Sequence, residues 1–319
     1  MDELVFLIAI AFALDFALGD PRWMPHPTRL IGGAAAALEG TLTRALGRGR
    51  SSGTCLTTII VGGAWLTAWE IIELGSYIDH RLGWALTIYL LYTTIAARDM
   101  DRHASHIFSA LRVGNLEEAR TSLAMIVGRD TKNLDEPEIV RASVESVAEG
   151  AVDGVLAPLF FAILGGAPLA MAYRAANTLD SMVGYRSENY LEFGWASARL
   201  DDLLNYVPAR LARLLYPAAA LVCGMRVLDS WRVSLRDGQK SPSPNAAISE
   251  AALAGALGVQ LGGVNIYQGV AEERPRIGDP HREPAPGDIP RAVLWMYASS
   301  VTGLVFFAGI KTLIGAITT

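Results

Sequence analysis

The chain has 319 residues, of which 51% are hydrophobic and 18% are charged, and its mean hydropathy is +0.30. This composition is more apolar than a soluble domain of that length needs, and it excludes intrinsic disorder and collagen-like sequence. A net charge of -5 without any block of Lys or Arg excludes a nucleic-acid-binding role.

The apolar residues gather in six segments, each near the roughly 20 residues that cross a bilayer. The segments are 4–18, 55–74, 82–97, 155–172, 211–227 and 292–317. They predict an all-α, polytopic helical membrane protein with four to six spans, in which residues 1–319 form a single integral membrane domain. Only residues 75–81 separate the second and third segments, which predicts a membrane hairpin.

The arginines predict the orientation of the chain. The stretch between the first two segments carries five arginines, whereas the loop at 75–81 carries only Arg81. Because positive residues favour the cytoplasmic side, we expect the N-terminus to face outward. Residues 98–154 and 229–290 are then polar, cytoplasmic-facing segments. The five arginines are Arg22, Arg29, Arg44, Arg48 and Arg50.

Capping patterns predict two helices in the first polar segment. Asn115 precedes an acid at capping-box spacing, which predicts a helix over 116–127. Asp135 repeats the pattern and predicts a helix over 136–150. Both helices are therefore expected in the polar layer rather than in lipid.

The second polar segment combines turn residues with one apolar helix. Ser and Pro residues over 229–245 predict a loop, and Asn245 is the expected N-cap of a helix over 246–257. The glycines at 258 and 262 form a GxxxG pattern that suits close helix packing. Residues 269–290 are rich in Pro, Gly and charge and predict another loop.

The fourth apolar segment carries Gly165, Gly166 and Pro168, which are poor residues for a straight helix. Such a break at membrane depth is tolerated where it lines a cavity or is buried in protein. We expect a broken or re-entrant segment here, and an ordinary kinked span is the alternative.

Polar residues also occur at the end of the first apolar segment. Asp15 lies within the segment, where an acid at a helix centre costs about 2.5 to 3.5 kcal/mol. An acid that reaches water at the helix end is the alternative. The following turn, 19–27, contains three prolines that hold Asp20, Arg22 and His26 in place.

A row of charged residues follows the predicted helix over 136–150. Arg141, Glu145, Glu149 and Asp153 recur every four residues. Acids on one helix face can bind Mg2+ through one or two carboxylates and leave coordination sites for phosphate oxygens. The alternative is a surface ion pair between Arg141 and Glu145, worth only about 0.3 to 0.5 kcal/mol.

Two further polar stripes make a polar cavity the better explanation. Asn and Asp are weak helix formers, so their number at helical spacing is unusual for helix interiors. The first stripe comprises Asn177, Asp180, Ser181 and Gly184, and the second comprises Arg199, Asp202 and Tyr206, beside Asp201 and Asn205.

The sequence has no P-loop, because its only lysines are Lys132, Lys240 and Lys311 and none follows the required glycines. A bound phosphate must therefore be held by arginine. The candidates are Arg129, Arg174, Arg199, Arg210 and Arg236.

Several blocks of sequence together resemble a known family. They are GDPRWMPHP at 19–27, VGRDT at 127–131, DGVLAPL at 153–159, NTLDSMVGY at 177–185, ARLDD at 198–202, SPSPN at 241–245 and the glycine-rich stretch at 255–263. The series resembles the adenosylcobinamide-phosphate synthase family of cobalamin-biosynthesis membrane proteins, in the same order and over residues 15 to 280.

The resemblance implies a multi-pass enzyme of the inner cell membrane whose active site faces the cytoplasm. Such an enzyme joins the propionate carboxyl of adenosylcobyric acid to (R)-1-amino-2-propanol or its O-phosphate, and it consumes ATP with Mg2+. The expected partners are these substrates and the lipid bilayer, but no nucleic acid. Assembly with further copies, or with other membrane enzymes of corrinoid synthesis, is left open.

The reaction and the residues together lead to a hypothesis for the site. Glu145, Glu149, Asp153 and Asp180 form a cluster for Mg2+ or the amine, with Asp201 and Asp202 as the second choice for metal. Arg129 and Arg199 bind phosphate. Asp20 and His26 supply base or substrate contacts. The other candidate substrate-binding residues are Arg22, Asp130, Asn177, Ser181, Tyr185, Asn205, Arg236, Ser243 and Asn245.

Two other classes of protein remain as alternatives. A membrane transporter would also show an intramembrane acid such as Asp15, a broken segment and polar stripes. A membrane regulator could share the fold without the reaction. The large polar segments on one side favour an enzyme, and the sequence contains no evident inverted repeat.

Overall fold

The computed structural model describes residues 2–21, 23–185, 187–241 and 243–318. Helices make up most of this part of the chain, and its two strands form one hairpin, so the predicted all-α class is confirmed. The chain divides into two compact units, of which unit 1 comprises residues 1–96, 157–205 and 304–319 and unit 2 comprises residues 97–156 and 206–303. Whether residues 1–319 act as a single membrane domain stays a prediction.

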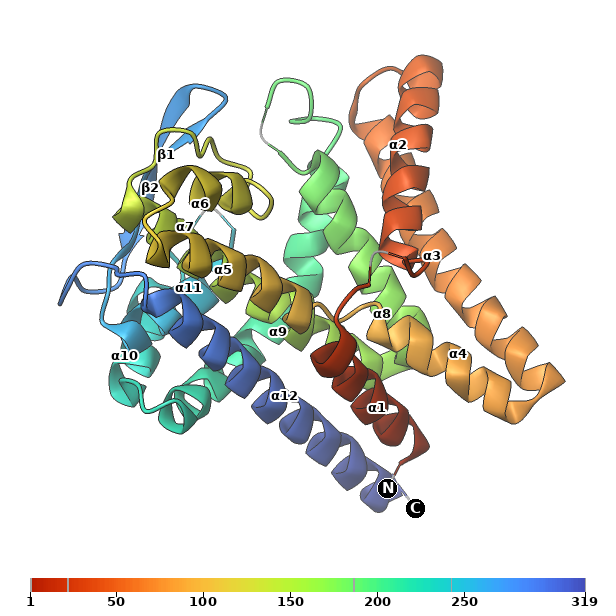
Figure 1. Ribbon diagram of the computed structural model, residues 1–319. Helices are drawn as coiled ribbons and strands as arrows, with labels where there is room; N and C mark the ends of the chain where they lie inside the picture. Colours follow the sequence, from red (N-terminus) through yellow and green to blue (C-terminus); the bar gives the residue numbers. More distant parts are fainter. Residues whose placement is uncertain (1, 22, 186, 242, 319) are drawn as a thin grey trace. The chain divides into compact units, whose positions relative to one another are not determined.

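Unit 1 is built from helices that pack around α3 and α8 (Figure 1). Its apolar core is the cluster of Ala35, Leu56, Ile60, Ala175, Leu179, Val183 and Phe193. Its helices are α1 (Glu3–Leu18), α2 (Pro27–Leu46), α3 (Arg50–Ile78), α4 (His80–Tyr92) and α8 (Ala157–Val183), with the first part of α9 (Trp195–Val222) and the end of α12 (Asp288–Thr318).

The predicted hairpin of two helices is present as α3 and α4, and its connection is tighter than expected. Asp79 alone separates the two helices, and its side chain accepts a hydrogen bond from the Arg81 N–H at 2.7 Å. A Cβ added to Gly75 would lie 2.4 Å from Leu86, and one added to Gly83 would lie 2.0 Å from a serine oxygen. The two glycines therefore let the helices approach closely.

Helix α8 is broken where the sequence predicted. Gly165 and Gly166 leave the helical conformation, and Gly166 has φ of 65°, which favours glycine. The arm before the break, 157–164, extends about 12 Å and cannot cross a hydrocarbon core of about 30 Å by itself. Residues 157–164 follow the helical residues 136–156 without a gap. The break at Gly165 and Gly166 separates residues 157–164 from the longer arm, residues 167–183.

Three helical stretches in the described part of the chain are long and apolar enough to cross a membrane, judged by length and composition. They are Arg50–Ile78, Glu136–Val183 and Asp288–Ala316. Helices α1 and α4 extend only about 24 and 20 Å, which is less than the thickness of a bilayer core. The structure is thus that of a polytopic helical membrane protein.

Unit 2 is organised around α11 (Ala246–Leu257), which is buried from Ala247 onward and packs against α10, α7 and both strands. Helices α5 and α6 pack against each other and against α7. The other elements are α5 (Ala97–Arg112), α6 (Leu116–Leu123), α7 (Glu136–Ala151), the π-helix η1 (Val152–Leu156), the rest of α9, α10 (Val227–Asp237), β1 (Leu261–Tyr267), β2 (Val270–Ile277) and the start of α12.

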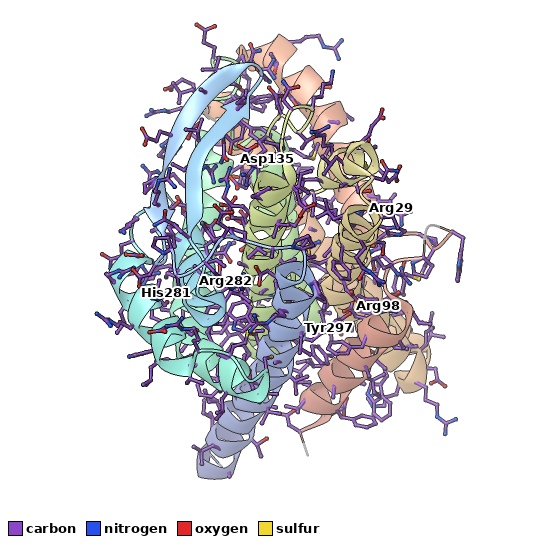
Figure 2. The ribbon with its side chains drawn as sticks, turned by 60° about the vertical axis from the view of Figure 1, so that its left-hand side comes forward. Arg29, Arg98, Asp135, His281, Arg282 and Tyr297 are labelled. Carbon is purple, nitrogen blue, oxygen red and sulfur yellow. The ribbon has the colours of Figure 1, made fainter. Side chains whose placement is uncertain are left out.

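The capping predictions are confirmed in unit 2. The Asn115 side chain accepts from the Glu118 N–H at 3.1 Å, although α6 ends at Leu123, four residues earlier than predicted. Asp135 and Glu138 form the reciprocal capping box at the start of α7 (Figure 2). Helix α7 therefore begins at the predicted residue and ends one residue after the predicted end.

A polar contact joins the first half of α12 to the start of α5. Tyr297 on α12 donates to Asp101 on α5 at 2.9 Å, and Arg98 donates to the same carboxylate at 2.7 Å. Figure 2 shows Arg98 and Tyr297 close together in this contact. Because Asp101 accepts from both residues, the start of α12 is fixed within unit 2.

The segment after residue 227 differs most from the prediction. Helix α10 occupies the first part of the predicted loop at 229–245, and the strands replace both the GxxxG helix packing and the first part of the predicted loop at 269–290. Gly258 ends α11 in the left-handed conformation with φ of 71°, and Gly262 lies in β1 with φ of 79°. These angles are incompatible with one continuous helix, which is why the helix-packing interpretation is wrong.

Candidate functional site

The hairpin β1–β2 carries the first part of the site and is held by the loop before α7. Its turn residues, Gln268 and Gly269, both have positive φ, as the tight turns of hairpins require. Asp130 accepts from the Gly269 N–H at 2.8 Å and donates its own N–H to the Ile266 carbonyl at 2.8 Å. Asp130, a predicted substrate-binding residue, therefore fixes the hairpin turn, and its role toward a substrate stays a prediction.

A buried ionic network joins the hairpin to α7. Glu145 lies between two arginines and pairs with Arg129 through one oxygen and with Arg141, at 3.3 Å, through the other. The Gly262 N–H of β1 also donates to Glu145 at 2.8 Å. Both oxygens of the Glu145 carboxylate are therefore occupied by donors from this chain.

The arginines of this network bind the hairpin as well as Glu145. Arg141 donates to the Gly262 carbonyl at 2.8 Å and to the Val264 carbonyl at 3.2 Å. The Asn265 side-chain oxygen accepts from Arg129 at 2.7 Å and from Arg141 at 3.1 Å. We call these four side chains, Arg129, Arg141, Glu145 and Asn265, the closed network. Arg141 and Glu145 of the predicted row are thus buried and join α7 to the hairpin, and the interpretation of the two residues as a surface pair is wrong.

One polar atom of the closed network has no partner. Asn265 is only 2% exposed, and its side-chain nitrogen makes no hydrogen bond within the described residues, although its oxygen accepts two. A buried donor without an acceptor costs about 1 to 3 kcal/mol. This nitrogen is therefore free to donate to a bound molecule.

Three further charged groups interact electrostatically with the closed network. They come from three elements: Glu149 from α7, Glu250 from α11 and Arg274 from β2. The charges of all three interact with one another, and both glutamates also interact with Arg129. Within the described residues none of the three side chains makes a hydrogen bond or ion pair, although the Arg274 guanidinium lies 5.7 Å from the centre of the Tyr267 ring. We call the three residues the open trio.

The open trio combines a buried carboxylate with two accessible groups. Glu250 is 9% exposed, whereas Glu149 and Arg274 are exposed. Burial and the neighbouring charges of Glu145 and Glu149 raise the pKa of Glu250 well above its ordinary value, and the attraction of Arg274 and Arg129 does not offset them. Strong perturbation of a carboxyl by burial and specific charges is typical of functional sites.

Sequence reasoning identified Glu145, Glu149 and Arg129 but missed Glu250, Arg274 and Asn265. Glu250 is the only charged residue of an otherwise alanine-rich helix, and an acid surrounded by small apolar residues is a usable signal. Arg274 and Asn265 had no such signal because the strands were not predicted.

Asp153 lies in the π-helix that follows α7 and is half-buried. Single π-helical turns inserted between α-helices occur frequently at functional sites. The predicted partner of Asp153, Asp180, belongs to unit 1, so the proposed cluster divides between the two units. Their joint action on a metal or amine stays a prediction.

Unit 1 contains a second polar network, between α8 and α9. Tyr173 donates to the Asn205 side-chain oxygen at 2.9 Å, and Asn205 donates to Asp201 at 3.0 Å. Asn177 donates to the other Asp201 oxygen at 3.3 Å and accepts from Arg174 at 3.4 Å. The two predicted polar stripes therefore meet in part, at Asp201, and the contacts are largely buried.

The remaining residues of these stripes lie nearer the surface. Asp180 is half-buried, and a Cβ added to Gly184 would lie 2.0 Å from its carboxylate, so only glycine fits there. Ser181 donates to the Asn177 carbonyl at 3.0 Å. Asp202 is half-buried, whereas Tyr185 and Arg199 are exposed.

The proline-rich turn near the N-terminus brings Asp20 and His26 together. The His26 side-chain nitrogen lies 3.3 Å from an Asp20 oxygen, and His26 is buried. The hydroxyls of Tyr92 and Tyr89 donate to the carbonyls of Gly19 and Pro25 and hold the turn. Arg22, predicted to bind substrate, lies outside the described residues, and Asp15 is buried in α1.

The last group of predicted binding residues lies around α10 and the loop before α11. Arg236 pairs with Asp237 at 2.7 Å and with Asp279 at 2.9 Å, so its guanidinium is occupied by two carboxylates. Asn245 precedes α11 without capping it by its side chain, and it accepts from Arg210 at 3.1 Å instead. Ser243 lies in the same loop.

The described residues contain no group of three or more His, Cys, Asp or Glu side chains that could hold a metal ion. Mg2+ is commonly bound by one or two carboxylates together with waters and substrate phosphates, and a site of that kind needs no group of three protein ligands. The predicted metal residues Asp153, Asp180, Asp201 and Asp202 stay predictions.

The fold and the charged clusters define a polytopic helical membrane protein with a charged site in its unit 2. The profile of the CobD/Cbib protein family matches residues 8–296. The chain belongs to this family, which places it in cobalamin biosynthesis.

Named relatives cover almost the whole chain. The cobalamin biosynthesis protein CobD of Geobacter metallireducens is 46% identical over 318 residues, which is 100% of each chain. CobD of Citrobacter koseri is 44% identical over 96% of this chain and 97% of its own, and CbiB of Salmonella choleraesuis is 45% identical over 93% and 94%. No solved structure matches the chain.

Proposed function

We propose that this protein is an amide-forming ligase that joins adenosylcobyric acid to (R)-1-amino-2-propanol or its O-phosphate and consumes ATP. The product is adenosylcobinamide or its phosphate. The observation that carries the proposal is the cluster of three arginines and three glutamates in unit 2 of a chain that belongs to the CobD/CbiB family. The substrates themselves come from the family resemblance.

The reaction needs an activated carboxyl group and an unprotonated amine. The substrate carboxylate attacks the terminal phosphorus of ATP, which forms an acyl phosphate and releases ADP. The amine then attacks the acyl carbon, the amide forms, phosphate leaves and one proton passes from nitrogen to a base. The site must therefore attract an amine and stabilise phosphate.

Charged side chains of unit 2 are suited to these tasks. Glu149 and Glu250 supply carboxylates that can attract an ammonium group, and Arg274 is an accessible guanidinium that can bind phosphate oxygens. Glu145 serves a different purpose, because its oxygens are occupied by Arg129, Arg141 and Gly262. Mg2+ would enter with ATP and neutralise phosphate charge there.

The cellular setting is also part of the proposal. The positive-inside pattern supports an inner-membrane protein whose charged unit 2 faces the cytoplasm, where ATP is available. The apolar helices of unit 1 would lie in the bilayer and supply a surface for a large amphiphilic corrinoid.

The test is reconstitution of the reaction with purified protein in lipid nanodiscs. Adenosylcobyric acid, Mg-ATP and either amine should give an amide product, detected by its mass, together with one ADP for each amide. ATP cleavage that requires no corrinoid, or a complete lack of amide with both amines, would contradict the proposal. Uptake of a corrinoid into proteoliposomes without ATP cleavage would favour a transporter.

A further inference from the structure

The open trio combines a buried acid that has no hydrogen-bond or ion-pair partner within the described residues with two accessible charges. Glu149, Glu250 and Arg274 come from α7, α11 and β2, and α11 packs against both of the other elements. Their charges interact, yet none donates to or accepts from a side chain of the described residues. Nine-tenths of the Glu250 side chain is nevertheless buried. A buried carboxylate without a partner indicates that an external group completes the site.

The closed network supplies a second, independent indication of a ligand. Asn265 is buried and its side-chain nitrogen has no acceptor within the described residues. The oxygen of the same amide accepts from Arg129, whose charge interacts with both Glu149 and Glu250. Glu250, the unused acid, and Asn265, the unused amide donor, therefore both interact with Arg129.

The charges of the trio fit a small molecule with both a positive and a negative end. A cation alone would be repelled by the Arg274 guanidinium, and an anion alone would be repelled by the two glutamates. A zwitterion satisfies both sets of groups. The O-phosphate of (R)-1-amino-2-propanol is such a molecule, because it carries a positive ammonium group and a negative phosphate. Two carbons separate its amine nitrogen from the phosphate ester oxygen.

We propose that Glu149, Glu250 and Arg274 bind the amine substrate, with the two carboxylates at its ammonium group and the guanidinium at its phosphate. This inference rests on the proposed ligase function and assigns the residues that select the amine. The Asn265 side-chain nitrogen is the additional donor beside them. Arg274 then makes the enzyme prefer the phosphorylated amine, since the free amino alcohol offers the guanidinium no negative charge.

The first test compares the two amines as substrates of Arg274→Gln. The KM for the amine phosphate should rise by about tenfold to a hundredfold, as expected for loss of a charge-assisted contact. The KM for the unphosphorylated amine and the KM for ATP should stay as in the native enzyme. Arg276→Gln is the matched control, because Arg276 is an exposed arginine on the same strand and donates to Gln260.

The second test concerns the carboxylates. Glu149→Gln and Glu250→Gln should raise the KM for both amines by a similar factor, because the amino group is common to both. Glu273→Gln, an exposed acid on β2, should leave the KM values unchanged. If Glu250→Gln fails to accumulate in the membrane, Glu149→Gln and Arg274→Gln still decide the question, because their side chains are exposed.

The outcomes separate this inference from the ligase function. Amide formation by the native protein without a KM difference between Arg274→Gln and Arg276→Gln would overturn the assignment and leave the ligase intact. A higher KM for ATP in Arg274→Gln would assign the guanidinium to the nucleotide instead, and would also overturn it. If the native protein forms no amide, the proposed ligase function is wrong. In that case, calorimetry measures the affinity of both variants for the amine phosphate alone. Equal affinities of Arg274→Gln and Arg276→Gln would overturn the proposed binding site as well.

Discussion

The closed network and the open trio are neighbouring sets of charged residues, but their bonding differs completely. In the closed network, Glu145 accepts from Arg129, Arg141 and Gly262, and the arginines also bind the hairpin. In the open trio, Glu250 is equally buried but has no direct partner within the described residues. Burial of charge therefore serves two purposes in unit 2, since one set joins elements and the other is arranged for a ligand.

Mutations in the two sets should change the free energy of unfolding in opposite directions. Removal of a partner from the closed network leaves buried charge uncompensated and should destabilise the protein. Removal of a carboxylate charge from the open trio relieves repulsion among the glutamates and should stabilise the protein, at the expense of function.

The largest effect is expected for Glu145→Gln. The change leaves the buried guanidiniums of Arg129 and Arg141 without their counter-ion, and we expect a loss of about 3 to 5 kcal/mol. Thermal unfolding in detergent measures it, with Glu136→Gln as the control, because Glu136 is an exposed acid in the first turn of the same helix. A loss equal to that of the control would mean that the network does not hold the hairpin.

The polar network around Asp201 in unit 1 tests whether loss of a buried hydrogen-bond partner destabilises the protein there as well. Asp201→Asn keeps the shape but provides one acceptor oxygen for the two amide donors of Asn177 and Asn205. One buried donor is then left unpaired, so we expect a loss of about 1 to 3 kcal/mol in the free energy of unfolding.

Thermal unfolding of Asp202→Asn provides the comparison for that variant, since Asp202 is the neighbouring, half-buried acid. Equal melting temperatures of the two variants would show that Asp201 does not depend on its amide partners for stability.

The sequence was sufficient for features that depend on local interactions. The capping box at Asp135 and Glu138 determined the start of α7, and the break at Gly165 and Gly166 followed from glycine conformation. These are short-range effects of backbone hydrogen bonding and of φ, so neighbouring residues contain the necessary information.

The site required information from distant parts of the chain. The row on α7 was recognised, but the partners of Arg141 lie on a strand more than a hundred residues away. Strand β2 lies in the stretch predicted as a loop, because Pro275 and several charges interrupt it and its exposed residues show no alternation of burial. The glycines at 258 and 262 instead favoured helix packing at the start of β1. Without the strands, the role of Arg274 could not be deduced.

The melting temperature of Glu250→Gln, measured as a function of pH, tests whether removal of this buried charge stabilises the protein. The pKa of Glu250 in the folded protein lies above the ordinary value of 4.5, so the folded state binds more protons than the unfolded state from about that pH upward. Native stability contributed by this group therefore falls as pH rises. The variant lacks this loss, so its melting temperature should exceed that of the native protein by a margin that grows toward pH 8.

The same series with Glu273→Gln, an exposed acid on β2, should give a difference that does not grow with pH. A native protein that is stabilised relative to Glu250→Gln at high pH would reverse the sign and would place Glu250 in the closed network.

The smallest effect is expected for Asp130→Ala, next to the closed network. The carboxylate of Asp130 holds only the Gly269 N–H, and its other bond to the hairpin comes from its backbone and survives the change. Because the site is exposed, we expect a loss of about 0.5 to 1 kcal/mol. Hydrogen exchange should become faster at the turn while the amide of Gly262, which Glu145 holds, stays protected. Faster exchange along the whole of β1 would instead mean that the turn and the buried network hold the hairpin as one cooperative unit.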